Sequence, residues 1–322
     1  MMNLPPFGIG TLHFGSSLNK KICKEIIFKA VDLGVNFFDT SPLYGNALSE
    51  EILGGIFSEI RQPVFIATKV GLQQAQRKDG QFGVEIIKLT EQNLRKSVEN
   101  SLKKLKKETI DLLTLHAFDP HTPISETLDA LIQLHQEGKI RYLGCSNYNP
   151  EQLKCLLKEI KKKSCSFFLT AQCHYNMIER RAGVSFIPFC EKNGLQIIIN
   201  RALARGALSG QYVASAIYPE QSRAAKSWRI RKWLTFERIS LIETLSRLSK
   251  KKNLSLTEIA LIWLKKNHPK SVPLLGVRNA EQLNQCLNIK SDLLDETFFT
   301  EIEAIISKAS HVYCSPPRYF EK

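Results

Sequence analysis

The chain has 322 residues, of which 43% are hydrophobic and 24% charged, with a mean hydropathy of -0.17 and a formal net charge of +14. These values exclude an intrinsically disordered chain, and no apolar run reaches the roughly 18 residues that a membrane-spanning helix needs. The charge raises nucleic acid as a partner, but the basic residues are spread over expected helical faces such as 94–108, 157–164 and 245–253. Because no aromatic residues are interleaved among them, we interpret them as solvated helical faces and expect no nucleic-acid partner.

The N-terminal sequence MMNLPPFGIG contains no basic segment followed by an apolar run. We therefore expect a cytoplasmic protein that does not associate with membranes. The eight cysteines are irregularly spaced and form no CxxC pair. They are predicted to be reduced and structural, and no metal site is expected.

Short apolar, β-branched runs recur along the chain and predict strands at 36–40, 64–69, 111–116, 142–147, 168–173, 195–200 and 271–276. Amphipathic segments between them predict helices, including 20–33, 90–105, 123–138 and 150–161. A weak eighth strand is predicted around CLNIKS, at 286–291. Continuous apolarity within each run favours strands that are buried on both faces.

Alternation of strands and helices is typical of parallel strands joined by helical crossovers. Seven or eight such repeats in about 300 residues favour an α/β fold, a closed (β/α)8 TIM barrel, over an open doubly wound sheet. No Pro/Gly/Ser-rich linker divides the chain, so one domain is expected over 1–322. The segment 211–232 is predicted to be a loop over the barrel mouth, and loops near 14–20 and 73–84 are expected to help shape the pocket.

Polar residues close most of the predicted strands: Asp39, Lys69, His116, Ser146 with Asn147, Gln172 and Asn200. The carboxyl ends of barrel strands lie on one face, so these side chains are expected to gather there. A histidine in such a place is often only a satisfied core residue. A buried lysine needs a counter-charge, for which Asp39 is available, and that pair could also be purely structural.

Tyr44 follows Asp39 in a Pro/Gly/Asn loop. A free phenol has a pKa near 10, and a neighbouring ammonium lowers it. We therefore expect Tyr44 to be a proton donor whose pKa is lowered by Lys69, while Asp39 keeps Lys69 charged and oriented. His116 is expected to donate a hydrogen bond to the same oxygen or to orient a substrate carbonyl.

The chain resembles the aldo-keto reductase family from FGIGT, at Phe7, to about Leu287. The motifs that carry the resemblance are FFDTSPLYGNALSEEILG, FIATKVG, IDLLTLHAFDP, EGKIRYLGCSNY, AQCHYNMIERR, RALARGALSGQY and LLGVRNAEQL. The resemblance implies a (β/α)8 barrel, a nicotinamide cofactor bound across the barrel mouth, and carbonyl reduction. By position it implies that Asp39, Tyr44, Lys69 and His116 form the catalytic tetrad.

The resemblance also implies the cofactor contacts. Ser146, Asn147 and Gln172 match the residues that hold the nicotinamide carboxamide, and Arg278 matches the residue that contacts the 2′-phosphate of NADPH/NADP+. The further cofactor-binding residues expected are Gly10, Thr11, Asn200, Arg201, Gly276 and Gln282. A helix beginning near Ala280 is expected to direct its first amides at a phosphate.

Three positions depart from the family pattern. Asn200 replaces the aromatic residue that commonly stacks on the nicotinamide, Leu275 replaces a proline, and Cys286 replaces an asparagine that often contacts adenine. Arg201 near the mouth is open to three interpretations: contact with an anionic or polyhydroxylated substrate, contact with the cofactor pyrophosphate, or a structural salt bridge.

The leading functional hypothesis is NADPH-dependent reduction of an aldehyde, ketone or sugar carbonyl. The alternative is a nucleotide-binding regulatory subunit with slow turnover, as the potassium-channel β subunits of this family are. The expected partner is a small-molecule carbonyl compound, and the expected state is a monomer or weak homo-oligomer.

Overall fold

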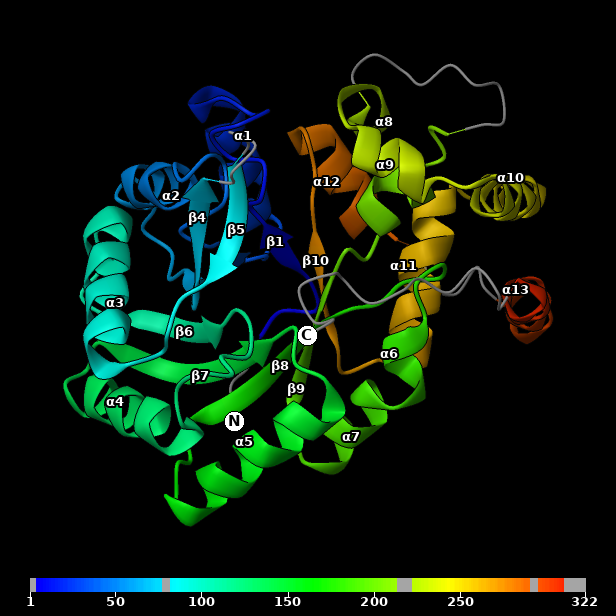
Figure 1. Ribbon diagram of the computed structural model, residues 1–322. Helices are drawn as coiled ribbons and strands as arrows, with labels where there is room; N and C mark the ends of the chain where they lie inside the picture. Colours follow the sequence, from blue (N-terminus) through cyan, green and yellow to red (C-terminus); the bar gives the residue numbers. More distant parts are fainter. Residues whose placement is uncertain (1–3, 77–81, 213–221, 290–294, 310–322) are drawn as a thin grey trace.

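The computed structural model describes residues 4–76, 82–212, 222–289 and 295–309 (Figure 1). Eight parallel strands close into a barrel in the order β1-β10-β9-β8-β7-β6-β3-β2. Their bounds are β1 Gly8–Gly10, β2 Phe37–Asp39, β3 Phe65–Val70, β6 Ile110–Leu115, β7 Ile140–Ser146, β8 Phe168–His174, β9 Gln196–Asn200 and β10 Val272–Leu275. The predicted (β/α)8 TIM barrel is confirmed.

The helices surround the barrel, and neighbours such as α2 and α3 or α3 and α4 pack side by side (Figure 1). Up to β9 they are α1 Lys20–Asp32, α2 Ser49–Phe57, α3 Glu91–Leu105, α4 Ile124–Gln136, α5 Pro150–Lys162, α6 Arg181–Val184 and α7 Phe186–Lys192. After β9 come the 3-10 helix η1 Ala204–Ser209, then α8 Arg223–Lys226, α9 Trp228–Trp233, α10 Phe236–Lys251, α11 Leu256–Asn267, α12 Ala280–Leu287 and α13 Glu296–Lys308. The four helices predicted from periodicity agree with α1, α3, α4 and α5 to within two residues at each end.

Local sequence explains several helix starts. At α5, the Asn149 side chain accepts from the Gln152 amide while the Gln152 side chain accepts from the Asn149 amide. Pro150 follows Asn149 at the first helical position, where its missing N–H costs nothing. Ser255 and Glu258 form the same reciprocal pair at α11. These caps fix where the chain turns from a loop into the outer helices.

The predicted eighth strand at 286–291 is wrong, and the eighth strand is β1. Residues 280–287 form α12, in which Leu283 and Cys286 are buried at helical spacing, and 290–291 lie outside the described residues. The sequence signal for β1 is weak because two of its three residues are glycines. A Cβ on Gly8 would lie 2.5 Å from a ring carbon of Phe37, so only glycine lets β1 pack this close to β2.

Two of the predicted loops contain regular structure. After β3, the strands β4 Leu72–Gln76 and β5 Phe82–Ile86 pair antiparallel, and the connecting residues 77–81 lie outside the described part. Part of 211–232 is helical, forming α8 and most of α9, while 213–221 is not described. Both segments are rich in polar and basic residues, so they show no periodic pattern of apolar residues from which these strands and helices could be predicted.

The lumen of the barrel is packed with apolar side chains and is not a pore. Phe37, Ala67, Leu112, Ile198, Val272 and Leu274 form one buried cluster from five strands. Side chains alternate between the two faces of a strand, so residues two or four positions further on point to the same side. Asp39, Lys69 and His116 follow Phe37, Ala67 and Leu112 by two, two and four residues, and so lie above this cluster at the barrel's carboxyl end.

No helix in the described ranges combines the length and the apolar character needed to cross a membrane. The seven cysteines in these ranges are free thiols, and only Cys155 is exposed.

Candidate active site at the barrel mouth

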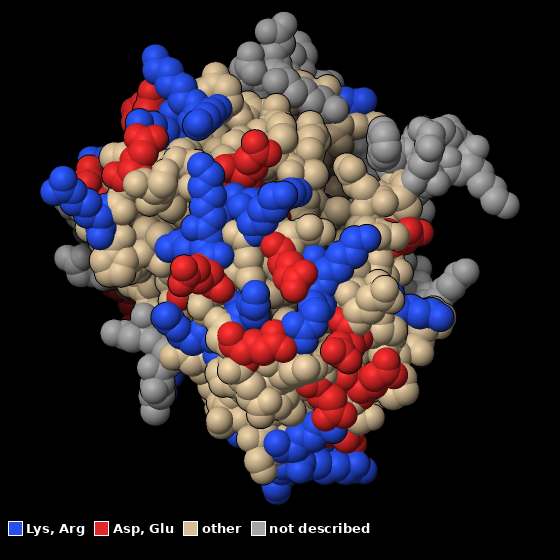
Figure 2. All heavy atoms as spheres, turned by 90° about the vertical axis from the view of Figure 1, so that its left-hand side faces the viewer, with Lys and Arg blue, Asp and Glu red and all other residues tan. Residues whose placement is uncertain are grey.

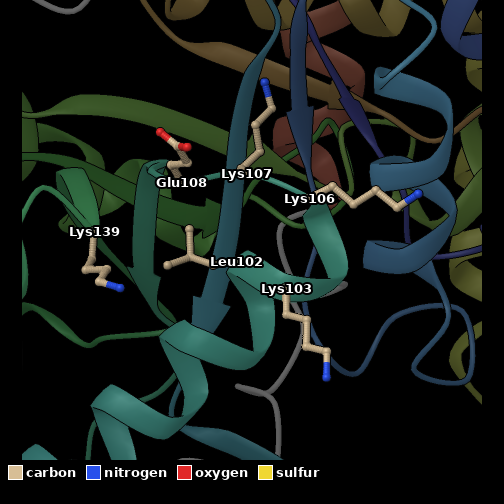
Figure 3. Close-up of a pocket in the computed structure, with 6 residues that line it drawn as sticks. All are labelled: Leu102, Lys103, Lys106, Lys107, Glu108 and Lys139. Carbon is tan, nitrogen blue, oxygen red and sulfur yellow. The ribbon is translucent and has the colours of Figure 1, made fainter.

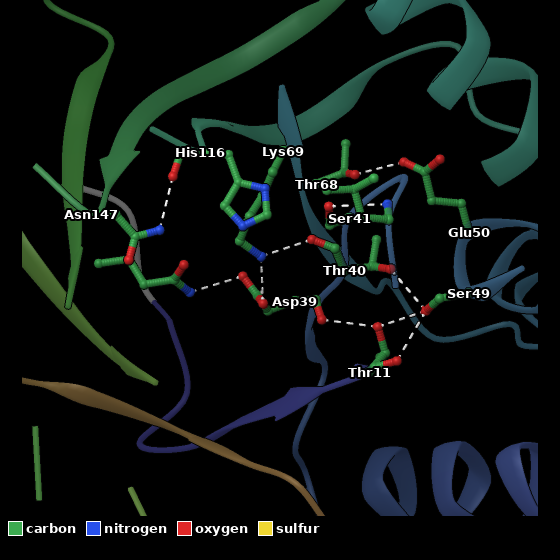
Figure 4. Close-up of polar contacts among 12 residues, drawn as sticks. Thr11, Asp39, Thr40, Ser41, Ser49, Glu50, Thr68, Lys69, His116 and Asn147 are labelled. Atoms are coloured by element: carbon green, nitrogen blue, oxygen red, sulfur yellow. Dashed lines mark hydrogen bonds and ion pairs between the residues drawn. The ribbon is translucent and has the colours of Figure 1, made fainter. Parts of the chain in front are cut away.

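The structure brings Asp39, Lys69 and His116 together at the carboxyl ends of β2, β3 and β6 (Figure 4). Tyr44, in the loop after β2, joins them. Lys69 Nζ lies 2.6 Å from Asp39 Oδ2 and donates a second hydrogen bond of 2.8 Å to the Thr40 carbonyl. The same ammonium lies 4.7 Å from the centroid of the Tyr44 ring. The His116 ring meets the Tyr44 ring edge-on, with centroids 6.2 Å apart. Residues that are up to 77 positions apart in the sequence thus form one polar cluster.

Lys69 is only 1% exposed, so its charge depends on its neighbours. Burial by itself lowers the pKa of Lys69. Asp39 and Tyr44 raise this pKa through charge and hydrogen bonding, and their effect is the larger one, so the pKa of Lys69 lies above its usual value. The side chain is therefore an ammonium at neutral pH. The expected Asp39–Lys69 pair is confirmed as an ion pair.

The expectation of a lowered Tyr44 pKa is wrong for the protein alone. Burial raises the pKa of Tyr44, and this effect outweighs the lowering by Lys69, so the pKa lies above its usual value near 10. Asp39 adds to the rise, while Arg201 lowers the pKa of Tyr44 slightly. The prediction from sequence took account of the effect of the nearby ammonium on the Tyr44 pKa, but not of the effect of desolvation. At neutral pH Tyr44 is therefore a neutral phenol that carries a proton to donate.

His116 is neutral at neutral pH. Burial holds the pKa of His116 well below its usual range, and the charge of Lys69 lowers it further. Its backbone amide donates to the Val70 carbonyl at 2.7 Å, and its carbonyl accepts from the Asn147 side chain at 2.8 Å. A neutral imidazole carries one N–H, which suits it to donate a hydrogen bond to a carbonyl oxygen.

The loop that carries Tyr44 has an unusual backbone. Gly45, Asn46 and Ala47 all adopt positive φ values, of 60°, 58° and 67°. A Cβ on Gly45 would lie 1.5 Å from the Phe14 carbonyl oxygen, so no other residue fits there without moving the chain. The loop therefore stores strain next to Tyr44, which packing must hold in place.

The residues expected to hold a nicotinamide carboxamide lie beside this cluster. Gln172 donates its amide to Asp39 Oδ1 at 3.0 Å, and Asn147 donates its amide to the His116 carbonyl. Ser146 Oγ, Gln172 Oε1 and Asn200 Oδ1 are buried without a hydrogen-bond partner in the described part of the chain. A carboxamide offers both N–H donors and a carbonyl acceptor, so these unpaired atoms fit such a group.

The residues expected at the phosphate end surround the start of α12. The helix begins at Ala280, as predicted, but Asn279 caps it by accepting from the Gln282 amide at 2.8 Å. The Gln282 side chain reaches back and accepts from the Arg278 amide at 3.0 Å. Gly276 is exposed, and a Cβ there would meet no atom within 4 Å. Gln282 thus helps to shape the turn that presents Arg278.

Thr11 has a structural contact that the sequence did not predict. Its hydroxyl donates to the Asp39 carbonyl at 3.0 Å and accepts from Ser49 Oγ at 2.8 Å, while Gly10 pairs with Asp39 across β1 and β2. Ser49 also lies 2.9 Å from Thr40 Oγ1 (Figure 4). These hydroxyls anchor the end of β2, where Asp39 is placed.

Comparison with known proteins identifies the family. The profile of the Aldo/keto reductase family matches residues 6–307. The chain belongs to the aldo-keto reductase family. It is 30% identical over 295 residues to the uncharacterised oxidoreductase YrpG of Bacillus subtilis (strain 168), covering 89% of this chain and 88% of that protein.

Two further relatives agree with this assignment. The chain is 27% identical over 300 residues to aldo-keto reductase yakc [NADP(+)] of Schizosaccharomyces pombe, covering 90% of this chain and 85% of the relative. The structure of glycerol dehydrogenase AKR11B4 from Gluconobacter oxydans superposes with a TM-score of 0.81 at 28% identity, over 98% of this chain and 95% of that one. As an aldo-keto reductase, the chain is an NAD(P)H-dependent oxidoreductase that acts on carbonyl groups.

Sequence considerations missed a second group of residues at the mouth of this aldo-keto reductase. His174 ends β8, and burial together with Arg201 and Arg205 holds its pKa well below the usual range. Arg205 lies 3.6 Å from Glu179, and Asn176 donates to both Glu179 and the Arg201 carbonyl, at 3.2 and 2.9 Å. The contacts of this group join two segments, one after β8 and one after β9, and no periodicity in the sequence indicates that these segments lie close together.

One surface hollow lies at the other end of the barrel. It has a volume of about 420 Å³ and is lined by Leu102, Lys103, Lys106, Lys107, Glu108 and Lys139 (Figure 3). These residues precede β6 and β7, whereas the candidate site follows the strands. The lysine side chains in Figure 3 point in different directions and do not converge on one point.

The face over α2, α3 and α4 carries both signs of charge (Figure 2). Arg95 pairs with Glu137 through two contacts of 2.7 and 2.8 Å, and Lys163 pairs with Asp129 at 2.6 Å. In the described ranges no group of three or more His, Cys, Asp or Glu residues is placed to hold a metal ion.

Proposed function

We propose that the protein reduces an aldehyde, ketone or sugar carbonyl to the alcohol with NADPH, and that Tyr44 donates the proton. The observation that supports this proposal best is the fully buried Lys69 ammonium, paired with Asp39 and 4.7 Å from the Tyr44 ring. A buried charge of this kind is costly, and its place beside a neutral phenol favours a role in proton transfer.

Each member of the cluster has a distinct part in this proposal. Tyr44 gives its proton to the carbonyl oxygen as negative charge develops there, and Lys69 stabilises the tyrosinate that remains. Asp39 keeps Lys69 charged and oriented. His116, neutral because it is buried, donates a hydrogen bond to the same carbonyl oxygen.

The cofactor's part is to supply the hydride for the carbonyl carbon. Ser146, Asn147 and Gln172 would hold its carboxamide, which the unpaired buried oxygens of Ser146 and Gln172 support. The remaining residues proposed to bind the cofactor are Gly10, Thr11, Asn200, Arg201, Gly276, Arg278 and Gln282. Use of NADPH is supported by the name of the Schizosaccharomyces pombe relative, which specifies NADP(+).

A panel of carbonyl compounds tests the activity directly. Neutral aldehydes, ketones, open-chain sugars and phosphorylated aldehydes are mixed with the protein and NADPH, and the loss of NADPH absorbance is followed. We expect turnover with at least one class. Failure with every class, together with stable co-purification with a membrane protein, would instead favour the regulatory-subunit alternative.

Arg278 provides a test of cofactor choice. If its guanidinium contacts the 2′-phosphate, Arg278→Ala removes a charge-assisted contact of about 1.5–3 kcal/mol. We expect the Kd of NADPH to rise about 10- to 100-fold and that of NADH to change little, measured by quenching of intrinsic fluorescence at fixed ionic strength. Lys270→Ala is the matched control, because Lys270 is exposed and precedes β10 at the opposite end of the barrel. An equal loss for both cofactors would show that Arg278 does not read the 2′-phosphate.

Three expectations from the sequence stay predictions: a single domain spanning 1–322, a cytoplasmic location, and a monomeric or weakly oligomeric state.

A further inference from the structure

A buried carboxyl group lies directly behind the candidate site. Glu50, in the first turn of α2, is 1% exposed, and no cationic side chain of the described residues forms an ion pair with it. Its Oε2 atom has no hydrogen-bond partner in those residues. The chemistry proposed above does not use this carboxyl group. A buried acid without an ion-pair partner is costly, so its presence needs a physical explanation.

Glu50 contacts the strand that carries Lys69. The Thr68 hydroxyl donates to Glu50 Oε1 at 2.6 Å (Figure 4). Because side chains alternate along β3, Lys69 points into the barrel while Thr68 points outward to the helices. The Glu50 carboxyl therefore holds the residue next to Lys69 from behind the strand.

The same carboxyl group lies beside α3. Burial raises the pKa of the Glu50 carboxyl group above its usual value. Ser101 on α3 and the charges of Lys104 and Lys69 act on this pKa in the opposite direction. One turn after Glu50, a Cβ on Gly54 would lie 2.2 Å from the Lys104 carbonyl oxygen, so α2 and α3 are in direct backbone contact. The two helices therefore pack closely within one turn of Glu50.

Lys104 extends this group of contacts to the Tyr44 loop. Its ammonium makes a long hydrogen bond of 3.5 Å to the Ala47 carbonyl, at the end of the positive-φ run that follows Tyr44. Glu50 itself follows Tyr44 by six residues through this loop. The carboxyl group therefore lies where the Tyr44 loop, the Lys69 strand and α3 meet.

Resting on the function proposed above, we propose that Glu50 is a positioning residue for this reaction: through Thr68 on one side and the α3–Ala47 contact on the other, it sets the placement of Lys69 relative to Tyr44. Lys69 then stabilises the tyrosinate only when Glu50 holds the strand and the loop together. A shift of about 1 Å at a reacting group can cost about 100-fold in rate.

The test compares three variants with the wild type. Glu50→Ala removes the carboxyl group, Glu50→Gln keeps its shape and a hydrogen-bond acceptor, and Glu51→Gln changes an exposed neighbour in the same helical turn. We expect Glu50→Ala to lower kcat about 10- to 100-fold with little change in KM for the carbonyl substrate. Glu50→Gln should retain kcat within about threefold, and Glu51→Gln should match the wild type.

Thr68→Val is a second variant, which tests the same contact if the Glu50→Ala protein does not fold. Valine keeps the shape of the threonine side chain and removes only the hydroxyl group that donates to Glu50. We expect Thr68→Val to lower kcat as well. A Glu50→Ala or Thr68→Val protein that loses thermal stability but keeps the wild-type kcat would overturn the proposal, since Glu50 would then be purely structural.

A titration of Tyr44 separates this inference from the proposed function. Tyrosinate absorbance is followed against pH for each protein and for the same protein carrying Tyr44→Phe, and the difference gives the Tyr44 pKa. If Glu50→Ala displaces Lys69, the Tyr44 pKa rises further, because the lowering by the ammonium is lost. An unchanged Tyr44 pKa overturns the inference even when no carbonyl compound is reduced, whereas lack of turnover in the wild type contradicts only the proposed function.

Discussion

Tyr44→Phe is expected to lower kcat for carbonyl reduction by about two to four orders of magnitude, because it removes the proton given to the carbonyl oxygen. The ring remains, so its edge-on contact with His116 and its place over Lys69 are preserved. The Kd of NADPH should therefore change little. Steady-state kinetics with the best substrate of the carbonyl panel, together with cofactor titration by fluorescence, measures both quantities.

Tyr142→Phe is the matched control for this substitution. Tyr142 lies on β7 and stacks on Phe65 at a centroid distance of 6.3 Å, among the apolar residues that pack below the site. Removing its hydroxyl should leave kcat unchanged. If Tyr44→Phe also kept the wild-type kcat, Tyr44 would not be the proton donor.

Lys69→Met is expected to reduce both activity and stability. Methionine has a similar length but no charge, so the Asp39 carboxylate is left buried without its counter-charge. Breaking a buried ion pair in this way costs about 3–5 kcal/mol. The developing tyrosinate also loses its neighbouring ammonium, so kcat should fall by at least about 100-fold. Kinetics and thermal or urea unfolding measure the two losses separately.

The pH dependence of this ion pair has a defined direction. The pKa of Lys69 in the folded protein lies above its ordinary value of 10.5. Its contribution to the free energy of unfolding is therefore complete below the ordinary pKa and is lost as the pH rises through the folded pKa. Wild type and Lys69→Met should thus differ by a constant free energy of unfolding between about pH 6 and 9, and by less in more alkaline solution.

Asp39→Asn is the milder companion of Lys69→Met. Asparagine removes the counter-charge but keeps a side chain that can accept from Lys69 and Gln172. We expect a smaller loss of kcat and of stability than for Lys69→Met. A Lys69→Met protein with wild-type activity and stability would refute the arrangement of the whole cluster.

The sequence by itself determined the barrel and the residues that face its mouth. Continuous apolar runs such as 111–116 identify strands buried on both faces, and helix signals between them require parallel crossovers. A polar residue ending an otherwise apolar strand, such as Lys69, is unusual enough to be noticed without coordinates. These signals are local, because each depends on residues within one strand or one helix.

Only the tertiary structure decided the features that depend on close approach between distant segments. The strand Gly8–Gly10 was missed because glycines carry no strand pattern, and its necessity is visible only against Phe37. The predicted direction of the Tyr44 pKa shift was wrong, because desolvation depends on all the atoms that surround the ring. Glu50 was overlooked because an acid in the first turn of a helix is usually exposed at the helix N-terminus, and its burial arises where α2 and α3 meet behind β3. Burial and contact distance are properties of the packed molecule, and no single segment of the sequence contains them.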